Sequence, residues 1–326
     1  MGVPPGDWDS RIGRRLKLRD LHILGTVVRC GSMAKAALQL SMSQPAVSES
    51  VANLEDVFGV RLLDRSARGV EPTGYGRALL GRADVAFDEL RQGVRDIEFL
   101  ANPTAGEVRV ACGDTLAAGL LPAAIDQLSR RYPDVAVRVV QGNAERLEFR
   151  ELRERSVDLA LARIAVAFAE DDLDVELLFD DPHRVVAGAC SPWARRRKVT
   201  LAQLAGERWI FPSNRVIREL VAAAFVAQGL DLPRERLTCN SILLRNHLLA
   251  TGRFLTVLPV SVMRYSAKPW SLKALPIDLN VKPLSVAIVA LRNRTRSPVV
   301  ELFARYVRAA AKSLDSSARR ASGSTR

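Results

Sequence analysis

Residues 31–59 read GSMAKAALQLSMSQPAVSESVANLEDVFG, and this stretch predicts two helices joined by a short polar turn. Ser32 is placed to cap the first helix, which is expected over residues 33–40. Ser43 caps the second helix, and Pro45 is tolerated in its first turn because backbone amides there have no intrahelical acceptor. Two helices in this order form either a helix-turn-helix that binds DNA or a helical hairpin within an ordinary core.

The second helix has one apolar face and one polar face. Its apolar residues recur every three or four positions, and they are Val47, Val51, Leu54 and Phe58. The opposite face carries Pro45, Ser48, Glu49 and Ala52, with Gln44 at the exposed N-terminal end. A helix that buries one side and presents small hydrogen-bonding side chains on the other fits the major groove of DNA, which is about 12 Å wide. This polar face favours the DNA-binding interpretation.

A β-hairpin is predicted directly after the two helices. Residues 61–65 and 69–72 are short extended runs on either side of a basic turn at 66–68. Such a hairpin would form a wing beside the DNA, with Arg65 and Arg68 near the phosphates.

At this point the chain closely resembles the N-terminal domain of LysR-type transcriptional regulators. The residues that carry the resemblance are 18–21, Gly31, Ser32, Ala36, Ala37, Ser43, Gln44, Pro45, Ala46, Ser48, Leu54, Glu55, Gly59, Val60, Leu62, Leu63, Arg65, Thr73 and Gly76. The resemblance implies a winged helix-turn-helix domain over residues 18–73 that binds double-stranded DNA, with RNA polymerase as a candidate further partner. The DNA-binding residues expected on this basis are Ser32, Lys35, Ser43, Gln44, Pro45, Ser48, Glu49, Arg65, Arg68 and Thr73.

A long helix is predicted over residues 74–100, within a linker segment at 74–105, and Thr73 is placed to cap it. Its apolar residues alternate at spacings of four and three, which is typical of a seam between helices, and they are Ala83, Phe87, Leu90, Val94 and Ile97. The resemblance implies an antiparallel linker-helix dimer, and hence a homodimer or homotetramer. Packing of this seam within one chain is the alternative.

Beyond residues 102–106 the pattern changes to strands that alternate with helices, which predicts an α/β architecture with largely parallel sheets. The expected strands are 108–112, 135–140, 159–162, 185–189, 209–211, 255–258 and 286–290. The expected helices are 116–132, 144–155, 217–228, 241–251 and 298–314. A weaker resemblance implies the two-lobed, type 2 periplasmic-binding-protein-like effector domain of the same family over residues 106–314. Lobe I would comprise 106–181 and 276–314, and lobe II would comprise 182–275.

A small-molecule effector, expected to be an organic anion, would bind between these lobes. Ligands of open α/β sheets bind beyond the carboxyl ends of strands, and the candidates placed there are Thr115, Asn143, Arg163, Ser213 and Ser241. Thr115 lies where LysR-type domains commonly place an effector-binding Ser or Thr, although it could simply cap the following helix. Arg163 can hold a carboxylate through two parallel hydrogen bonds, or it can belong to a structural ion pair.

Composition adds few constraints on function. Of the net charge of +12, residues 1–105 contribute little, with 14 Lys and Arg against 13 Asp and Glu, so the overall charge is not evidence for DNA binding. The four cysteines are far apart and are expected to be reduced, and the three histidines are isolated, so no metal site or cofactor is expected. No apolar run reaches the roughly 18 residues that span a membrane, and no signal peptide is expected. The protein is therefore expected to be cytoplasmic, with a flexible arm at 1–17 and a disordered tail at 315–326.

Two other function classes remain open. One is a cytoplasmic solute-binding protein whose helical N-terminus only forms oligomers. The other is an α/β enzyme, which is disfavoured because the sequence has no GxSxG, Walker or HExxH motif.

Overall fold

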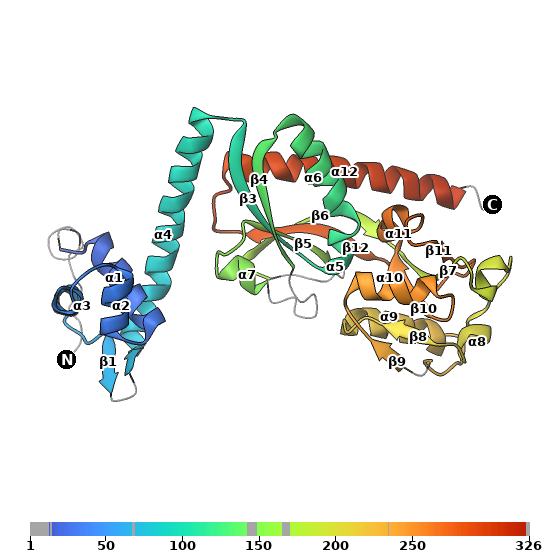
Figure 1. Cartoon of the computed structure of the whole chain (residues 1–326), viewed down its shortest axis with the longest axis horizontal. Helices are drawn as coiled ribbons and strands as arrows, with labels where there is room; N and C mark the ends of the chain where they lie inside the picture. Colours follow the sequence, from blue (N-terminus) through green and yellow to red (C-terminus); the bar gives the residue numbers. More distant parts are fainter. Residues whose placement is uncertain are drawn as a thin grey trace. The chain divides into compact units, whose positions relative to one another are not determined.

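The computed structural model describes residues 13, 15–66, 69–141, 149–164, 170–233 and 235–323, with the side chains of 235–236, 265–266 and 315–323 excepted. The chain forms two compact units, residues 1–91 and residues 92–326 (Figure 1). Each unit has its own hydrophobic cores. Most of the expected N-terminal arm lies outside the described residues. No helix in the described part of the chain is long and apolar enough to cross a membrane.

The N-terminal unit is a three-helix bundle with a β-hairpin, as predicted. Its elements are α1 (Leu18–Cys30), α2 (Met33–Gln39), α3 (Gln44–Phe58), β1 (Leu63–Ser66) and β2 (Gly69–Pro72). The predicted caps are present, because Ser32 Oγ accepts a hydrogen bond from the Lys35 amide and Ser43 Oγ accepts one from the Ala46 amide. Leu24, Val47 and Val51 are fully buried in the core that these helices share.

The hairpin is fixed to the bundle by close backbone contacts. The Val70 amide donates to the Gly31 carbonyl at 3.0 Å, and a Cβ on Gly69 would lie only 2.7 Å from the same oxygen. Gly69 also has a φ of 129°, a conformation that other residues rarely adopt. Only glycine at this position therefore lets the wing approach the end of α1.

The long helix α4 (Gly74–Ala101) begins as predicted, since Thr73 Oγ1 accepts a hydrogen bond from the Gly76 amide. The predicted seam on this helix divides in two. Ala83 and Phe87 pack within the N-terminal core. Leu90, Val94 and Ile97 are 50%, 55% and 69% exposed. Packing within one chain therefore accounts for the first two seam residues only.

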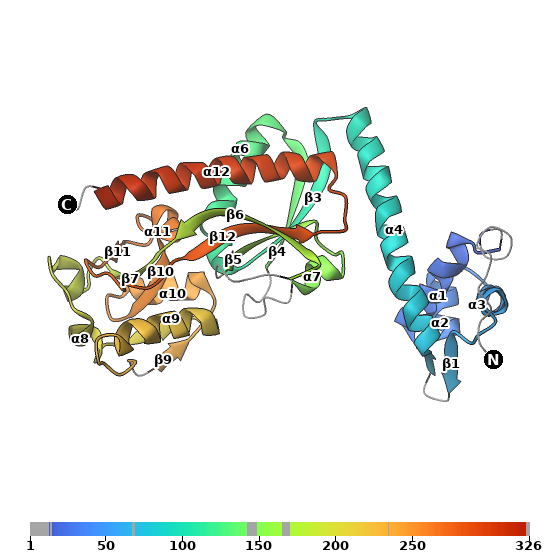
Figure 2. The ribbon, with the colours of Figure 1, turned by 180° about the vertical axis from the view of Figure 1, so that it is seen from behind.

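The second unit contains two five-stranded sheets, one in each of two lobes (Figures 1 and 2). The first lobe has the strand order β4 (Asp134–Gln141), β3 (Ala105–Cys112), β5 (Leu159–Ile164), β12 (Leu284–Leu291), β6 (Leu173–Asp181). The second lobe has the order β11 (Leu272–Ala274), β7 (His183–Gly188), β10 (Leu255–Pro259), β8 (Trp209–Phe211), β9 (Glu235–Thr238).

Both sheets are mixed, so the expectation of largely parallel sheets is wrong. In the first lobe β12 pairs antiparallel with both β5 and β6, and in the second β10 and β11 pair antiparallel with β7. β6, β9 and β11 were not predicted from the sequence. The predicted bounds of the other strands lie within a few residues of the observed ones.

Helices cover both faces of the first sheet. The elements of this lobe are α5 (Asp114–Ala117), α6 (Leu120–Arg131), α7 (Arg150–Arg153) and α12 (Pro298–Gly323). Figures 1 and 2 both show α6 beside α12. Val286 and Ile288 of β12 pack in the core beneath them, whereas Ala287 and Val289 pack with Leu152 of α7 on the other face. This alternation follows from the two-residue period of a strand.

Three helix predictions need correction. The helix expected at 116–132 is broken between α5 and α6, where Gly119 has a non-helical backbone (φ −114°, ψ −90°). Of the helix expected at 144–155, only α7 is described, and residues 142–148 lie outside the described part. The tail expected to be disordered from 315 is helical in its backbone as far as Gly323, because α12 continues without a break.

The second lobe carries its helices around the second sheet. They are the 3₁₀ helix η2 (Pro192–Arg195), α8 (Leu201–Leu204), α9 (Arg215–Val226), α10 (Ile242–Ala250) and α11 (Val260–Ser266). The chain first crosses between the lobes at Pro182, between β6 and β7. The sequence assigns residues from 276 onward to lobe I, but Leu279 is still buried in the core of the second lobe, so the return crossing lies later.

Candidate functional site

The exposed face of α3 is the candidate DNA interface. Gln44, Pro45 and Glu49 are exposed and Ser48 is half-buried, whereas Val47 on the opposite face is fully buried. The division of the helix into a buried and an exposed face is the one predicted from the sequence. Polar groups at the N-terminal end of such a helix can reach base edges when the helix enters a major groove.

Two exposed cations of the N-terminal unit are available to phosphates. Lys35 on α2 and Arg65 on β1 are exposed, and among the described residues neither makes an ion pair. Ser32 and Ser43 accept helix amides and retain a hydroxyl proton to donate. Thr73 differs, because its hydroxyl also donates to the Arg61 carbonyl at 2.8 Å and so has no proton left for a phosphate. Arg68 lies outside the described residues.

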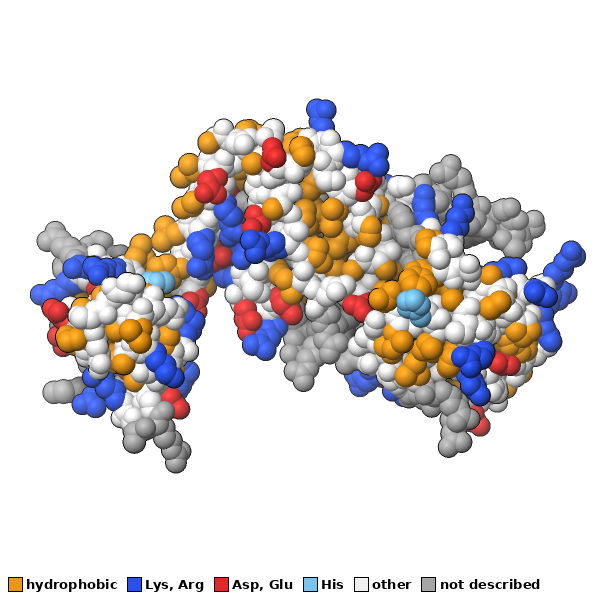
Figure 3. All heavy atoms as spheres, viewed as in Figure 1, with side chains coloured by type: hydrophobic (Ala, Val, Ile, Leu, Met, Phe, Trp, Pro, Cys, Tyr) orange, Lys and Arg blue, Asp and Glu red, His pale blue; other side chains and the backbone are white. Residues whose placement is uncertain are grey.

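Basic side chains are not concentrated at this interface. Figure 3 shows Lys and Arg side chains scattered over both units on the face that it presents. The overall charge therefore does not mark the DNA-binding face, as the sequence also suggested.

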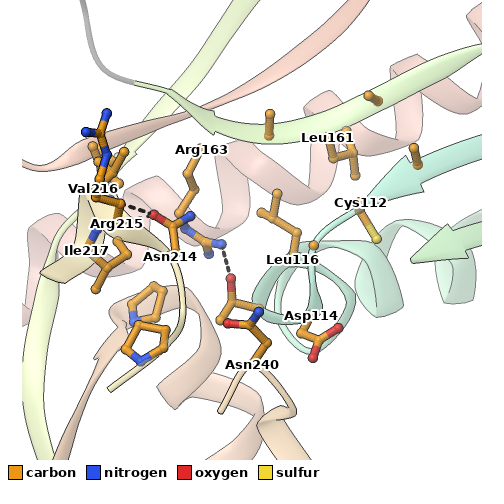
Figure 4. A pocket seen from close by; sticks show the side chains of 18 of the residues that line it. Cys112, Asp114, Leu116, Leu161, Arg163, Asn214, Arg215, Val216, Ile217 and Asn240 are labelled. Carbon is orange, nitrogen blue, oxygen red and sulfur yellow. Dashed lines mark hydrogen bonds between the residues drawn. The ribbon is translucent and has the colours of Figure 1, made fainter. Parts of the chain in front are cut away.

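The candidate effector site is a cavity of about 330 Å³ between the two lobes. The polar side chains that line it include Asp114, Thr115 and Arg163 from the first lobe, and Asn214, Asn240 and Arg245 from the second. Figure 4 shows Asp114 and Leu116 on α5 facing Asn214 and Asn240 across the cavity. His183, the first residue after the crossing at Pro182, also lines it.

Arg163 lines this cavity, but its guanidinium is held by protein groups. Nε and Nη2 donate to Asp181 Oδ2 at 3.1 and 2.7 Å. Nη1 donates to Thr115 Oγ1 at 2.6 Å. Arg163 therefore belongs to a structural ion pair, the second of the two readings that its sequence position left open. Thr115 does not cap α5, since Gly113 occupies the N-cap position, and its hydroxyl keeps a proton for a ligand.

The remaining predicted effector residues do not line the described cavity. Ser213 lies beside it, where its amide donates to the Asn240 side-chain oxygen at 2.9 Å. Ser241 caps α10 by accepting the Leu244 amide. Asn143 lies outside the described residues. Asn240, the residue directly before Ser241, does line the cavity.

Arg245, the most unusual side chain of the cavity, was not predicted from the sequence. It lies in the apolar run of α10 and is only 2% exposed. Burial lowers its pKa to about 10, against the opposing effect of Cys239 and Asp114. No hydrogen-bond acceptor is found for its Nε among the described residues. An arginine inside the apolar sequence ILLRNHLLA was the available signal, because arginine is rarely buried without a partner.

His183 and Cys112 are also buried at this site. Burial lowers the pKa of His183 to about 4, and the positive charge of Arg163 adds to this effect, so the imidazole is neutral at physiological pH. Burial and the negative charge of Asp114 raise the pKa of the Cys112 thiol to about 11. Cys112 is therefore protonated and a poor nucleophile.

The end of α4 is joined to the first lobe by a buried carboxylate. Asp158 Oδ1 lies 2.6 Å from Arg109 Nη2 and 3.1 Å from Arg294 Nη2, and Arg95 of α4 approaches the same oxygen at 3.7 Å. This cluster gives a physical connection between the linker helix and the sheet whose carboxyl edge borders the cavity.

Two known protein families match the chain, and together they cover most of its length. Residues 101–312 match the family described as "LysR substrate binding domain", and residues 18–77 match "Bacterial regulatory helix-turn-helix protein, lysR family". The chain belongs to the LysR family of transcriptional regulators. LysR-type regulators bind DNA and oligomerise, and their C-terminal domain binds an effector.

Relatives of this LysR-type chain match it over most of their length. The chain is 27% identical to YybE of Bacillus subtilis, an uncharacterised regulator, over 90% of this chain and 98% of the relative. It is also 27% identical to GbpR of Azospirillum brasilense, over 94% and 89%. Among solved structures, a full-length OxyR variant from Pseudomonas aeruginosa superposes with a TM-score of 0.63 at 24% identity, covering 90% of this chain and 95% of that one. CbnR superposes with 0.61 at 20% identity, over 91% and 99%.

Proposed function

We propose that this LysR-type regulator reads double-stranded DNA with the N-terminal half of α3 and responds to a small organic anion bound between its lobes. The observation that carries the DNA part is the exposed polar face of α3, with Gln44 and Ser48 on it and Val47 buried behind it. A related fold supports this proposal, since CbnR has been crystallised with its target DNA (TM-score 0.51, 22% identity, 91% of this chain and all of that one). Such a regulator acts in the cytoplasm. RNA polymerase would be the partner whose transcription of the target genes it increases or decreases.

The exposed seam of α4 supports oligomerisation through the linker helix. Leu90, Val94 and Ile97 recur at spacings of four and three, and each leaves half or more of its surface exposed. A second copy of α4 would bury this stripe. Two recognition helices in one dimer would then read two half-sites of an operator.

The cavity between the lobes supports the effector part. A ligand that touches both lobes binds one arrangement of the lobes more tightly than another. It can change DNA binding only by as much as its affinities for the two arrangements differ. The contacts of Asp158 with Arg95, Arg109 and Arg294 provide a route by which a change in the first lobe reaches α4.

Sequencing of genomic fragments retained by the purified full chain tests this function. We expect enrichment of a few fragments that share two half-sites, spaced by one or more helical turns of roughly 10.5 base pairs. Retention of no fragment, or equal retention of all fragments, would contradict the proposal and favour a solute-binding protein. The genes beside the enriched fragments would also indicate the effector.

A further inference from the structure

Arg245 is a buried cation for which the described residues provide no ion-pair partner. Its residue surface is 2% exposed, and its Nε has no acceptor among the described residues. The described ion pairs do not include it, although its cavity neighbour Arg215 pairs with Glu219 and Arg163 pairs with Asp181. A buried charge without a compensating partner is costly, so such groups are paired in most proteins.

The placement of Arg245 shows where a partner could come from. Arg245 lines the cavity between the lobes, and so does Asp114 of the facing lobe. Asp114 acts on Arg245 through space but does not come within the 4.0 Å of an ion pair. A ligand in the cavity can therefore reach the guanidinium without displacing a protein carboxylate.

A second orphaned polar atom lies in the same cavity. His183 is 5% exposed, and its Nδ1 has no hydrogen-bond partner among the described residues. The positive charge of Arg245 acts on this imidazole, which places the two side chains in one electrostatic environment. An unsatisfied nitrogen at this burial is uncommon in a folded protein unless a ligand or water satisfies it.

The rest of the lining is mainly apolar, with Glu151 and Arg215 as further charged residues. The apolar residues include Leu116 and Leu161 from the first lobe, Ile217 and Val257 from the second, and Leu284 at the start of β12. The volume of about 330 Å³ falls at the lower end of the range for small-molecule sites. The site thus offers one buried cation that is not ion-paired among the described residues, Arg245, and apolar walls for the remainder of a small ligand.

We propose that Arg245 and His183 form an anion subsite in the second lobe, which holds the carboxylate of a small monocarboxylic acid whose uncharged body fills the apolar part of the cavity. This inference rests on the proposed function and replaces Arg163 by Arg245 as the residue that carries the ligand's charge. The guanidinium binds the carboxylate through two parallel hydrogen bonds. His183, protonated on Nδ1 as a neutral imidazole, donates a third hydrogen bond to the carboxylate. Asp114 opposes anion binding and so limits affinity.

A direct test uses bromide as a simple anion. Crystals of the full chain are soaked in sodium bromide, and anomalous scattering locates the ions. We expect bromide within hydrogen-bond distance of the Arg245 guanidinium and none on Arg163, whose donors are occupied. An empty Arg245 at saturating bromide would overturn the subsite.

Calorimetric titration then defines the ligand class with matched pairs, hexanoate with hexanamide and benzoate with benzamide. We expect at least one acid to bind and its amide not to bind. Arg245→Met should weaken the acid about 30-fold or more, Arg245→Lys less, and Asp114→Asn should strengthen it. The control Arg131→Met, at an exposed arginine of α6 that does not line the cavity, should change affinity less than threefold. Equal binding of acid and amide would refute the proposal, and so would unchanged affinity in both Arg245→Met and Arg245→Lys. Tighter binding of the acid that also carries an α-amino group would refute it as well.

Stability separates a ligand-binding role from a structural one. If Arg245 is kept for a ligand, Arg245→Met should raise the Tm of the ligand-free protein by about 2–4 °C, because an uncompensated buried charge is removed. A lower Tm would mean that Arg245 supports the fold. Operator binding by the same variant, measured without ligand, should equal that of the parent. Loss of operator recognition in the parent itself would instead refute the proposed function and leave the anion subsite standing.

Discussion

Arg163 Nη2 lies 2.7 Å from Asp181 Oδ2, and this ion pair is almost completely buried at the first crossing between the two lobes. The Asp181 carboxylate also accepts hydrogen bonds from the backbone amide and the hydroxyl of Ser261, at 3.0 and 2.6 Å. The first lobe contributes Arg163 from β5, and the second contributes Ser261 from α11. The pair therefore fixes the hinge at which the lobes meet.

Removing one member of this pair should be strongly destabilising. Arg163→Met leaves the Asp181 charge buried, and the free energy of unfolding should fall by about 3–5 kcal/mol. Urea denaturation of the full chain measures it. Arg215→Met, which breaks only the exposed pair with Glu219, should cost about 1 kcal/mol or less. Equal effects of the two substitutions would contradict the assigned role of Arg163.

His183 should make the protein less stable in mild acid. Its folded-state pKa is about 4, below the ordinary value of 6.5, so between these values the unfolded chain binds more protons than the folded one. The stabilisation is complete above pH 6.5 and is lost as the pH falls toward 4, by at most about 1.4 kcal/mol per pH unit. Urea denaturation at a series of pH values should show this slope, and His183→Gln should reduce it. An unchanged slope in the variant would rule out His183 as its source.

Local patterns predicted the N-terminal unit closely. In α3, capping by Ser43 and the spacing of Val47, Val51 and Leu54 depend on neighbours within one or two turns, so the sequence contains the whole signal. Strands of the second unit with continuous apolar runs, such as β12, were also predicted, because a strand buried on both faces needs such a run.

Features that depend on distant residues could not be predicted. β6 is an edge strand in which acidic residues interrupt the apolar ones. Among the described strands it pairs only with β12, which lies about a hundred residues later in the chain. The sequence leaves two roles open for Arg163, because its partners Asp181 and Ser261 are distant in sequence and only the fold brings them together. Arg245 was overlooked for a related reason, since only the folded structure shows that nothing in the described residues pairs with it.

Arg65 should act as a phosphate anchor on the wing. Arg65→Ala should weaken specific and non-specific DNA about equally, and should lower the slope of log affinity against log salt by about one. Fluorescence anisotropy over a range of salt concentrations gives the slope. Arg131→Ala, an exposed arginine on α6 in the other unit, is the matched control and should leave it unchanged. A change of base preference in Arg65→Ala would mean that the wing is misplaced.

The exposed part of α4 should control assembly. Leu90→Glu would place an unpaired charge at a helix–helix interface, and the oligomer should dissociate toward monomer in sedimentation velocity. The control is Leu38→Glu on α2, which changes a more exposed leucine outside the seam and should leave the oligomer intact. An undisturbed oligomer in Leu90→Glu would show that another surface holds the subunits together.

Recognition of DNA bases by α3 should determine the affinity of the full chain for its own operator. Binding is measured at one fixed salt concentration for the parent, for Gln44→Ala and Ser48→Ala, and for Gln127→Ala, an exposed glutamine on α6. We predict that Gln44→Ala or Ser48→Ala weakens operator binding by about 1–3 kcal/mol, while the thermal stability and the binding of unrelated DNA stay the same. Gln127→Ala should match the parent. Unchanged operator affinity in both α3 variants would show that this face of α3 does not contact the bases.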